Sequence, residues 1–257
     1  MLPCTSERVI STHSSQEAAN HRLRLIATIE GVRLLAKQGC AFRGNDESAD
    51  STNRGNFDAI LSSFGRMNLE VQRVFDNAHG NAKYTSPLIQ KQIANILGNK
   101  VREKIRDEVG LAKFCILVDE VVDASSKEQM AIILRFVDCH GFIRERSEDV
   151  CNLALKFYPE DFTSYDLSAL DMECGFFVAD ILADPRFFNT SSFLQPQQKE
   201  LFQSMNIIKS RLRNKMEDDF LDDLMVLYIE KEFADSVDND YVIQEFEVSG
   251  TRRVRFR

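Results

Sequence analysis

The segment at 114–123, FCILVDEVVD, places the strongest constraint on the fold, because an apolar run there stops abruptly at the adjacent acids Asp119–Glu120. A short apolar run rich in strand-forming residues predicts a buried strand that ends near these acids. Two more strand-like runs follow at 130–137 and 142–147, separated by the turn-like sequence DCHG at 138–141. The three runs predict an antiparallel meander.

An acid at the end of a buried strand is a feature of RNase H-like nuclease cores, in which such carboxylates hold two divalent metal ions. A site of this kind needs at least three acidic ligands. The expected continuation is a crossover helix and a fourth, parallel strand that carries the second carboxylate. Here 148–156 leads instead into a stretch that contains Pro159 and has the spacing of a loop followed by a helix. The sequence therefore predicts a truncated, three-stranded core.

Composition narrows the class of protein. The chain has 257 residues, is 44% hydrophobic and carries a net charge of -8, which suits a globular protein and argues against one that coats nucleic acid over its whole surface. Neither a signal peptide nor a membrane span is expected, so we expect an intracellular soluble protein. The six cysteines form no CxxC pair. We expect free, mostly buried thiols and no zinc site, including at Cys139–His140.

Helical spacing dominates on both sides of the meander. Apolar residues recur with helical period over 21–37 and over 57–75. Ser86 and Pro87 form a helix-start signal, because Ser caps a helix and Pro suits its first turn; Gly110 supplies a stop. The predicted class is α+β, with a truncated RNase H-like core surrounded by helices and a C-terminal αα-hairpin. The predicted divisions are a disordered polar leader at 1–20, a helical region at 21–110, the core remnant at 111–150, a linker or helical segment at 151–195, the hairpin at 196–245 and a basic tail at 246–257.

Four motifs in order resemble the hAT superfamily of transposases, and within it the zinc-finger MYM-type 1-like branch found in plants. The motifs are AFRGNDESADSTNRGNF at 41–57, YTSPLIQKQIAN at 84–95, ILVDEVVDASSKEQMAIILRFVDCHGFIRER at 116–146 and FQSMNIIKSRLRNKMEDDFLDDLMVLYIEKEF at 202–233. The third resembles the first catalytic block of these transposases, and the fourth resembles their C-terminal dimerisation region.

The resemblance implies a nuclear DNA transposase with two divalent metals held by Asp, Asp and Glu. Asp119 matches the first catalytic Asp. The second Asp and the helical insertion after it have no counterpart, and Lys199 stands where the family has its Glu. We also expect no counterpart of the N-terminal zinc finger of full-length relatives, because the leader before the first helix holds no Cys/His set of the required spacing. One carboxylate does not hold two Mg²⁺ ions, so we expect a catalytically inactive protein without a cofactor.

Protein dimerisation is then the main expected activity, as a homodimer or as a heterodimer with related hAT proteins. The residues expected at the dimer surface are apolar positions of the hairpin: Phe202, Met205, Ile208, Leu212, Phe220, Leu221, Leu224 and Tyr228. A weak nucleic-acid contact is expected at a basic cluster that follows the first of them: Lys209, Arg211, Arg213 and Lys215. On base rates, the solvated face of a helix is the better explanation of the same cluster.

Three alternatives stay open. An active Mg²⁺-dependent transposase or nuclease would need another acid to complete the site, for example Asp161, Asp166, Asp171 or Glu200. A nucleic-acid-binding module would use the basic cluster and the tail at 252–257. Finally, a three-stranded sheet with an exposed edge and an uncovered apolar face predicts a fragment that folds poorly.

Overall fold

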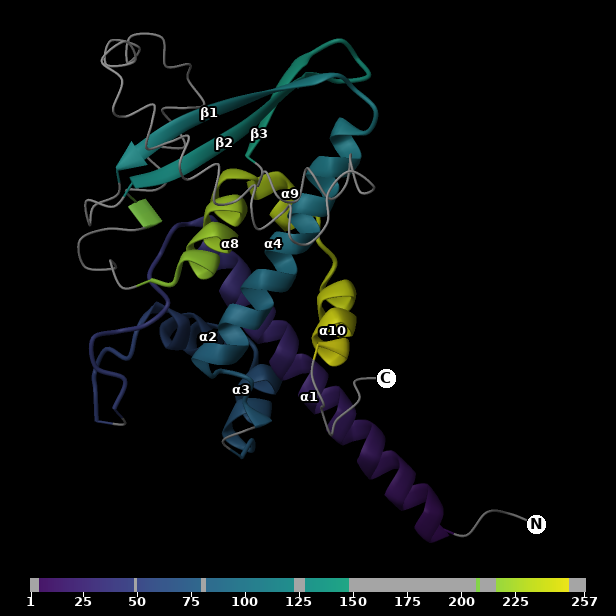
Figure 1. Ribbon diagram of the computed structural model, residues 1–257. Coiled ribbons are helices and arrows are strands. Elements are labelled where there is room, and N and C mark those ends of the chain that lie inside the picture. Colours follow the sequence, from purple (N-terminus) through teal and green to yellow (C-terminus); the bar gives the residue numbers. More distant parts are fainter. Residues whose placement is uncertain are drawn as a thin grey trace. The chain divides into compact units, whose positions relative to one another are not determined.

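A computed structural model describes residues 5–48, 50–79, 82–122, 128–147, 207–208 and 216–249 (Figure 1). The chain divides into two compact units. The first unit comprises Met1–Lys100 and Lys231–Arg257, and the second comprises Val101–Glu230. Within the described residues the structure is α+β, as predicted, and no helix there is long and apolar enough to cross a membrane.

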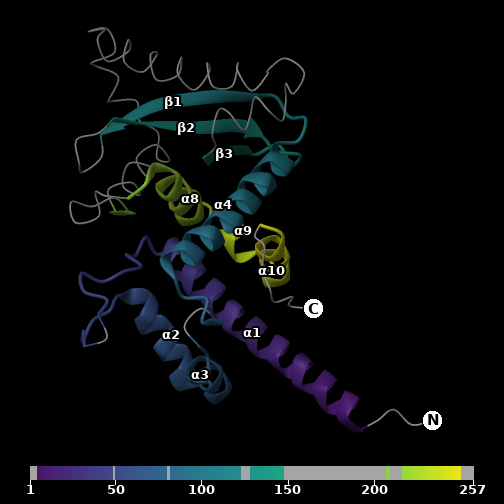
Figure 2. The ribbon, with the colours of Figure 1, turned by 60° about the horizontal axis from the view of Figure 1, so that its bottom comes forward.

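The first unit is organised around α1, Thr5–Lys37, which contacts α2, α3, α9 and α10 (Figure 2). Its end at Lys37 agrees with the predicted helix. Its beginning does not, because most of the expected disordered leader at 1–20 lies within α1. Glu, Gln and Ala at 16–19 favour helix, so the apolar helix extends backwards through polar sequence.

Two short helices occupy the segment where the spacing predicted one. They are α2, Asn56–Met67, and α3, Leu69–Asp76. Asn68 separates them: its backbone is extended, and its Oδ1 accepts hydrogen bonds from the N–H groups of Glu70 and Val71 at 2.9 and 3.4 Å. Asparagine is among the best N-cap residues, and capping here starts a new helix while the apolar period continues.

The predicted start and end of α4, Pro87–Val109, are confirmed. Ser86 Oγ accepts a hydrogen bond from the N–H of Ile89 at 3.4 Å. At the other end Gly110 adopts a left-handed φ of 52° and donates to the carbonyl of Arg106 at 3.0 Å. Much of the predicted apolar stripe is buried: Ile93, Leu97, Val101 and Ile105.

Two further helices complete the first unit. They are α9, Lys231–Asp235, and α10, Asn239–Val248, with Asp238 as the N-cap of α10. α10 runs past the boundary that we expected at 245. Arg33 of α1 reaches the link between these helices and the first residue of α10, since its guanidinium donates to the carbonyl of Val237 and to Oδ1 of Asn239, each at 2.8 Å. These contacts fix the start of α10 against α1.

The predicted meander is confirmed in the second unit. Strands β1, Phe114–Val122, β2, Glu128–Val137, and β3, Ile143–Ser147, form one antiparallel sheet in the order β1-β2-β3. The turn between β2 and β3 is built on Asp138. Its Oδ1 accepts from the N–H groups of His140 and Phe142, both at 2.9 Å, and Gly141 adopts a φ of 84°.

One face of this sheet is covered by the chain itself. Leu134 and Phe136 lie two residues apart on β2, so both point to the same face, where they pack with Val109 of α4. Helix α8, Asp218–Ile229, belongs to the same unit. The sheet is thus covered around Leu134 and Phe136, whereas Val137 and Ile143 are exposed.

The free thiols that we expected are confirmed for Cys40, Cys115 and Cys139. The expected burial is wrong for them, because Cys115 and Cys139 are exposed and Cys40 is half-buried. Cys115 is on an edge strand and Cys139 is in the β2–β3 turn, and both positions leave a side chain open to solvent. The other three cysteines lie outside the described residues.

Candidate functional site

Asp119 lies within a strand and not at its end. It is in β1, which continues to Val122, and its backbone pairs with Ala131 of β2. The sequence suggested an end at the acids because a carboxylate is unusual inside a strand. The ladder with β2 overrides this preference: Glu120 pairs with Met130, and Val122 pairs with Glu128. The expected loss of the second Asp, and the expected replacement of the Glu by Lys199, fall outside the described residues.

No metal cluster takes its place among the described residues. No group of three or more His, Cys, Asp or Glu side chains is suitably arranged there. The further acids considered above, Asp161, Asp166, Asp171 and Glu200, lie outside the described residues. Among the described residues no set of donors suits two Mg²⁺ ions, and no metal-dependent step is derived from them.

The expected dimer surface is partly buried by the chain's own packing. Ile208, Leu221 and Leu224 are buried, and Leu224 is 1% exposed. Phe220 and Tyr228 are half-buried. Phe202, Met205 and Leu212 lie outside the described residues, as do the basic residues Lys209, Arg211, Arg213 and Lys215. The second hairpin helix is also shorter than expected, because α8 ends at Ile229.

Arg102 of α4 contacts α8 through two of its acids. The sequence analysis did not single out this residue. Arg102 is 4% exposed and forms ion pairs with Asp222 and with Asp223, the latter at 2.9 Å. Burial lowers the pKa of Arg102, but the two carboxylates outweigh it and raise the pKa above its ordinary value. Two of the acids that crowd 217–223 therefore anchor α8 to the second half of α4.

A second arginine ties β3 to helices of the same unit. Arg146 makes a two-pronged pair with Glu108 of α4, at 2.6 and 3.0 Å, and reaches Glu230 after α8 at 3.3 Å. Such forked pairing has a fixed geometry. Arg146 belongs to the motif at 116–146 that resembles a catalytic block, and here its contacts are structural.

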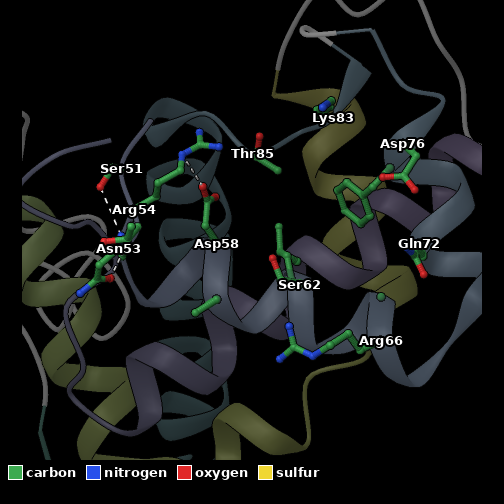
Figure 3. Close-up of a pocket in the computed structure, with 16 residues that line it drawn as sticks. Ser51, Asn53, Arg54, Asp58, Ser62, Arg66, Gln72, Asp76, Lys83 and Thr85 are labelled. Carbon is green, nitrogen blue, oxygen red and sulfur yellow. Dashed lines mark hydrogen bonds and ion pairs between the residues drawn. The ribbon is translucent and has the colours of Figure 1, made fainter. Parts of the chain in front are cut away.

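A hollow in the first unit lies between α2, α3 and the segments before each of α2 and α4 (Figure 3). We call it the α2–α3 groove, and its volume is about 590 Å³. Asp58, Ser62 and Arg66 line it from α2 at intervals of four residues, and Gln72 and Asp76 line it from α3 at the same interval. Residues four apart share a helix face, so each helix presents a polar stripe. The remaining lining is Ser51, Thr52, Asn53, Arg54, Gly55, Ala59, Leu61, Gly65, Phe75, Lys83 and Thr85.

One wall of this groove is formed by a crossed loop, in which the segment around Gly44 packs closely against the segment around Gly55. The N–H of Gly44 donates to the carbonyl of Arg54 at 3.2 Å, and the N–H of Phe57 donates to that of Phe42 at 3.0 Å. Gly55 has a φ of 117°, and a Cβ added to it would lie 2.4 Å from the nitrogen of Gly44. Only glycine suits this crossing, which explains the two RGN sequences within the motif at 41–57.

The backbone of Tyr84 is strained. This residue lies between Lys83 and Thr85, which line the groove from the segment before α4. It is the one described residue other than glycine with a positive φ, at 60°, a conformation that costs about 1–2 kcal/mol. Its buried ring packs edge-on against Phe246, and its Oη shares a 3.0 Å hydrogen bond with Nδ1 of His21. Burial and then the nearby Arg24 lower the pKa of His21, which Glu17 partly opposes. Nothing in the sequence signals this backbone conformation.

Comparison with known proteins places this arrangement in a family. Residues 4–154 match the family model described as DUF4371: ZMYM1/FAM200, RNase-like domain. A Homo sapiens protein named "52 kDa repressor of the inhibitor of the protein kinase" is 29% identical over 156 residues, which cover 55% of this chain and 20% of that protein. The chain thus spans about a fifth of the length of this relative. No solved structure matches.

The family match covers α1 to β3 and stops before the segment that resembles a dimerisation region. It includes the crossed loop, the α2–α3 groove, the whole meander and Asp119. Because it extends over more than half of the sequence, the chain belongs to the ZMYM1/FAM200 RNase-like domain family.

Proposed function

We propose that this chain is a catalytically inactive protein derived from a hAT transposase, and that its retained activity is association with a second hAT-type chain. The partner is a copy of itself or a related protein that carries the same C-terminal segment. By the same resemblance we place the protein in the nucleus and its origin in the plant branch.

The loss of metal ligands supports the inactive half of the proposal. The matched RNase-like domain at 4–154 includes β1, and by resemblance Asp119 is its first catalytic Asp. Phosphodiester cleavage by two metals needs ligands from several strands, which clamp the attacking and the leaving oxygen. The sequence keeps Asp119 but passes from β3 into a segment without the second Asp, and Lys199 would repel a cation at the third position.

The folded α8 is the observation that carries the association half. It forms the second part of the segment at 202–233 that resembles the dimerisation region, and Arg102 holds it through Asp222 and Asp223. Anchoring one side of this helix leaves its half-buried residues, Phe220 and Tyr228, as the described part of a contact surface. Preorganising a surface in this way reduces the entropy lost on association.

Light scattering during size-exclusion chromatography tests the association. We expect a particle of twice the 29.4 kDa chain mass, and we expect Phe202→Asp to reduce it to a monomer. Leu88→Asp is the matched control, because Leu88 is an exposed apolar residue outside the hairpin, 67% accessible, and its replacement should leave the dimer intact. A wild-type monomer, or a dimer that both variants retain, would overturn this half.

A nicking assay tests the inactive half separately. Supercoiled DNA incubated with the protein and Mg²⁺ should stay intact, and Asp119→Ala should behave like the wild type. Mg²⁺-dependent nicking that Asp119→Ala removes would establish the alternative, an active nuclease. The weak nucleic-acid contact at Lys209, Arg211, Arg213 and Lys215 stays a prediction, and a binding constant that falls steeply with salt is its signature.

A further inference from the structure

The break between α8 and α9 has no local cause in the sequence. Helix α8 ends at Ile229 and α9 begins at Lys231, so Glu230 alone separates them. Neither Gly nor Pro occurs within 216–249, and glutamate is not among the preferred cap residues. The next break differs, because Asp238 caps α10 with its side chain. The sequence by itself therefore favours one helix that continues through Glu230.

A single backbone torsion produces this break. The N–H of Glu230 still donates to the carbonyl of Val226 at 2.9 Å, as in a helix, and its φ is -93°. Its ψ is 51°, compared with about -42° in an α-helix. The side chain is buried, and its Oε2 lies 3.3 Å from Nη1 of Arg146 on β3. A contact between distant segments thus accompanies the break, and rotation about one bond joins α8 and α9 into one helix.

Beyond the break, the α9–α10 segment, 231–248, lies beside α1 (Figure 2) and is held there by polar contacts. Asn239 accepts a hydrogen bond from Arg33, and its Nδ2 donates to Oε1 of Glu30 at 2.7 Å. Two ion pairs add to these contacts: Arg22 with Asp240, and Lys37 with Asp235. Because the partners of these residues all belong to α1, the α1 of a second copy offers an identical set.

The position of the break in the chain suits an exchange of this segment between copies. The boundary between the two compact units falls between Glu230 and Lys231, so the chain enters the first unit there. The rest of that unit is formed by the first hundred residues. A terminal element that follows a short hinge and packs on distant sequence is one that two identical chains can exchange with little loss of contacts.

We propose that the α9–α10 segment of one chain docks on α1 of a second copy, and that the two copies exchange this segment reciprocally. The inference rests on the proposed association and adds a contact to the surface around Phe220 and Tyr228. The structure describes the form in which the segment packs on its own α1. In the exchanged form Glu230 is helical, α8 continues into α9, and the same side chains pair between chains.

Zero-length cross-linking of the full chain tests the exchange. Unlabelled and isotopically labelled chains are mixed in equal amounts, unfolded in urea and refolded together, and native mass spectrometry confirms that the dimer fraction contains mixed dimers. A carbodiimide then joins amines to carboxylates in contact, and the linked peptides that contain Lys37 and Asp235 are identified by mass. With exchange, about half of these pairs should combine a labelled and an unlabelled peptide, because random pairing makes that share of the dimers mixed.

A substitution at the hinge tests the continuous helix. Lys231→Pro suits the first position of α9 but blocks a helix that runs through Glu230. We expect it to remove the mixed pairs. Lys231→Ala is the matched control, because it removes the same side chain, permits the continuous helix and should keep the mixed pairs. Circular dichroism verifies that both variants are folded.

The outcomes separate the exchange from the association on which it rests. If mixed dimers form but every linked pair of Lys37 and Asp235 comes from one chain, the exchange is wrong and the association stands. If the wild type is a monomer, both are wrong. If folded Lys231→Pro keeps the wild-type share of mixed pairs, the continuous helix through Glu230 is wrong.

Discussion

Each of the two compact units buries an arginine, and the two solve the problem of a buried charge differently. Arg24 of α1 is 6% exposed, and the partner that its Nη1 reaches is the carbonyl of Val74 at 2.8 Å. Arg102 of α4 is 4% exposed and meets two carboxylates. Burial lowers the pKa of Arg24, and the smaller opposing effect of Tyr84 does not restore it. In Arg102 the two carboxylates outweigh burial and raise the pKa.

The difference shows what each arginine does for its unit. Val74 contributes one of the last four carbonyls of α3, which have no partner within the helix, so Arg24 caps the end of that helix. Its Nε has no hydrogen bond in the described structure. Arg102, in contrast, neutralises acids on a helix far along the chain. Removing Arg24 therefore leaves one carbonyl unsatisfied, whereas removing Arg102 takes a cation away from two carboxylates, one of which is buried.

The largest effect should come from Arg102→Met. Asp223 is buried, and removing one partner of a buried ion pair costs about 3–5 kcal/mol. The free energy of unfolding from urea titration measures this cost, with Arg73→Met at an exposed site of α3 as the control. Adding Asp222→Ser and Asp223→Leu to Arg102→Met should recover most of the loss. If it does not, lost packing and not charge explains the effect.

Arg24→Met should cost less, about 1–2 kcal/mol, since it leaves one unsatisfied carbonyl and no unpaired carboxylate. The same urea titration measures it, and the comparison requires that the loss stay below that of Arg102→Met. Equal losses would show that Arg24 also compensates a charge.

The smallest effect concerns His21, beside Arg24. Burial lowers the pKa of His21 below its ordinary 6.5, so the folded chain favours the neutral ring. The stabilisation is complete above pH 6.5 and is lost as pH falls through the lower, folded-state pKa. Melting temperatures measured between about pH 8 and about pH 5 should therefore fall more for the wild type than for His21→Gln. Parallel curves would contradict the lowered pKa.

Local signals in the sequence located many of the elements. Ser86, Pro87 and Gly110 give the bounds of α4, and the strand-like runs give the meander, because each depends on a few neighbouring residues. The break at Asn68 was missed, since an apolar period persists across it. The strand end expected at Asp119 was wrong because pairing with β2, a contact between segments, extends β1 beyond the acids.

The candidate sites were harder to predict for the same reason. Apolar positions such as Leu221 and Leu224 look alike in a sequence whether they face a partner or the chain's own core. Their helix is paired through Asp223 with Arg102, which lies more than a hundred residues away in the sequence. The polar stripe at Asp58, Ser62 and Arg66 was visible as a four-residue repeat, but the groove exists only because α3 and Lys83 face it.

Because the thiols of Cys115 and Cys139 are exposed, oxidation of the sample can change its apparent oligomeric state. An accessible thiolate attacks a disulfide or is oxidised in air, so two chains can become joined covalently through either residue. A covalent pair has the same mass as an associated one, but a reductant such as dithiothreitol separates it. A dimer that persists in reductant is held by non-covalent packing, and one that disappears is held by an intermolecular disulfide.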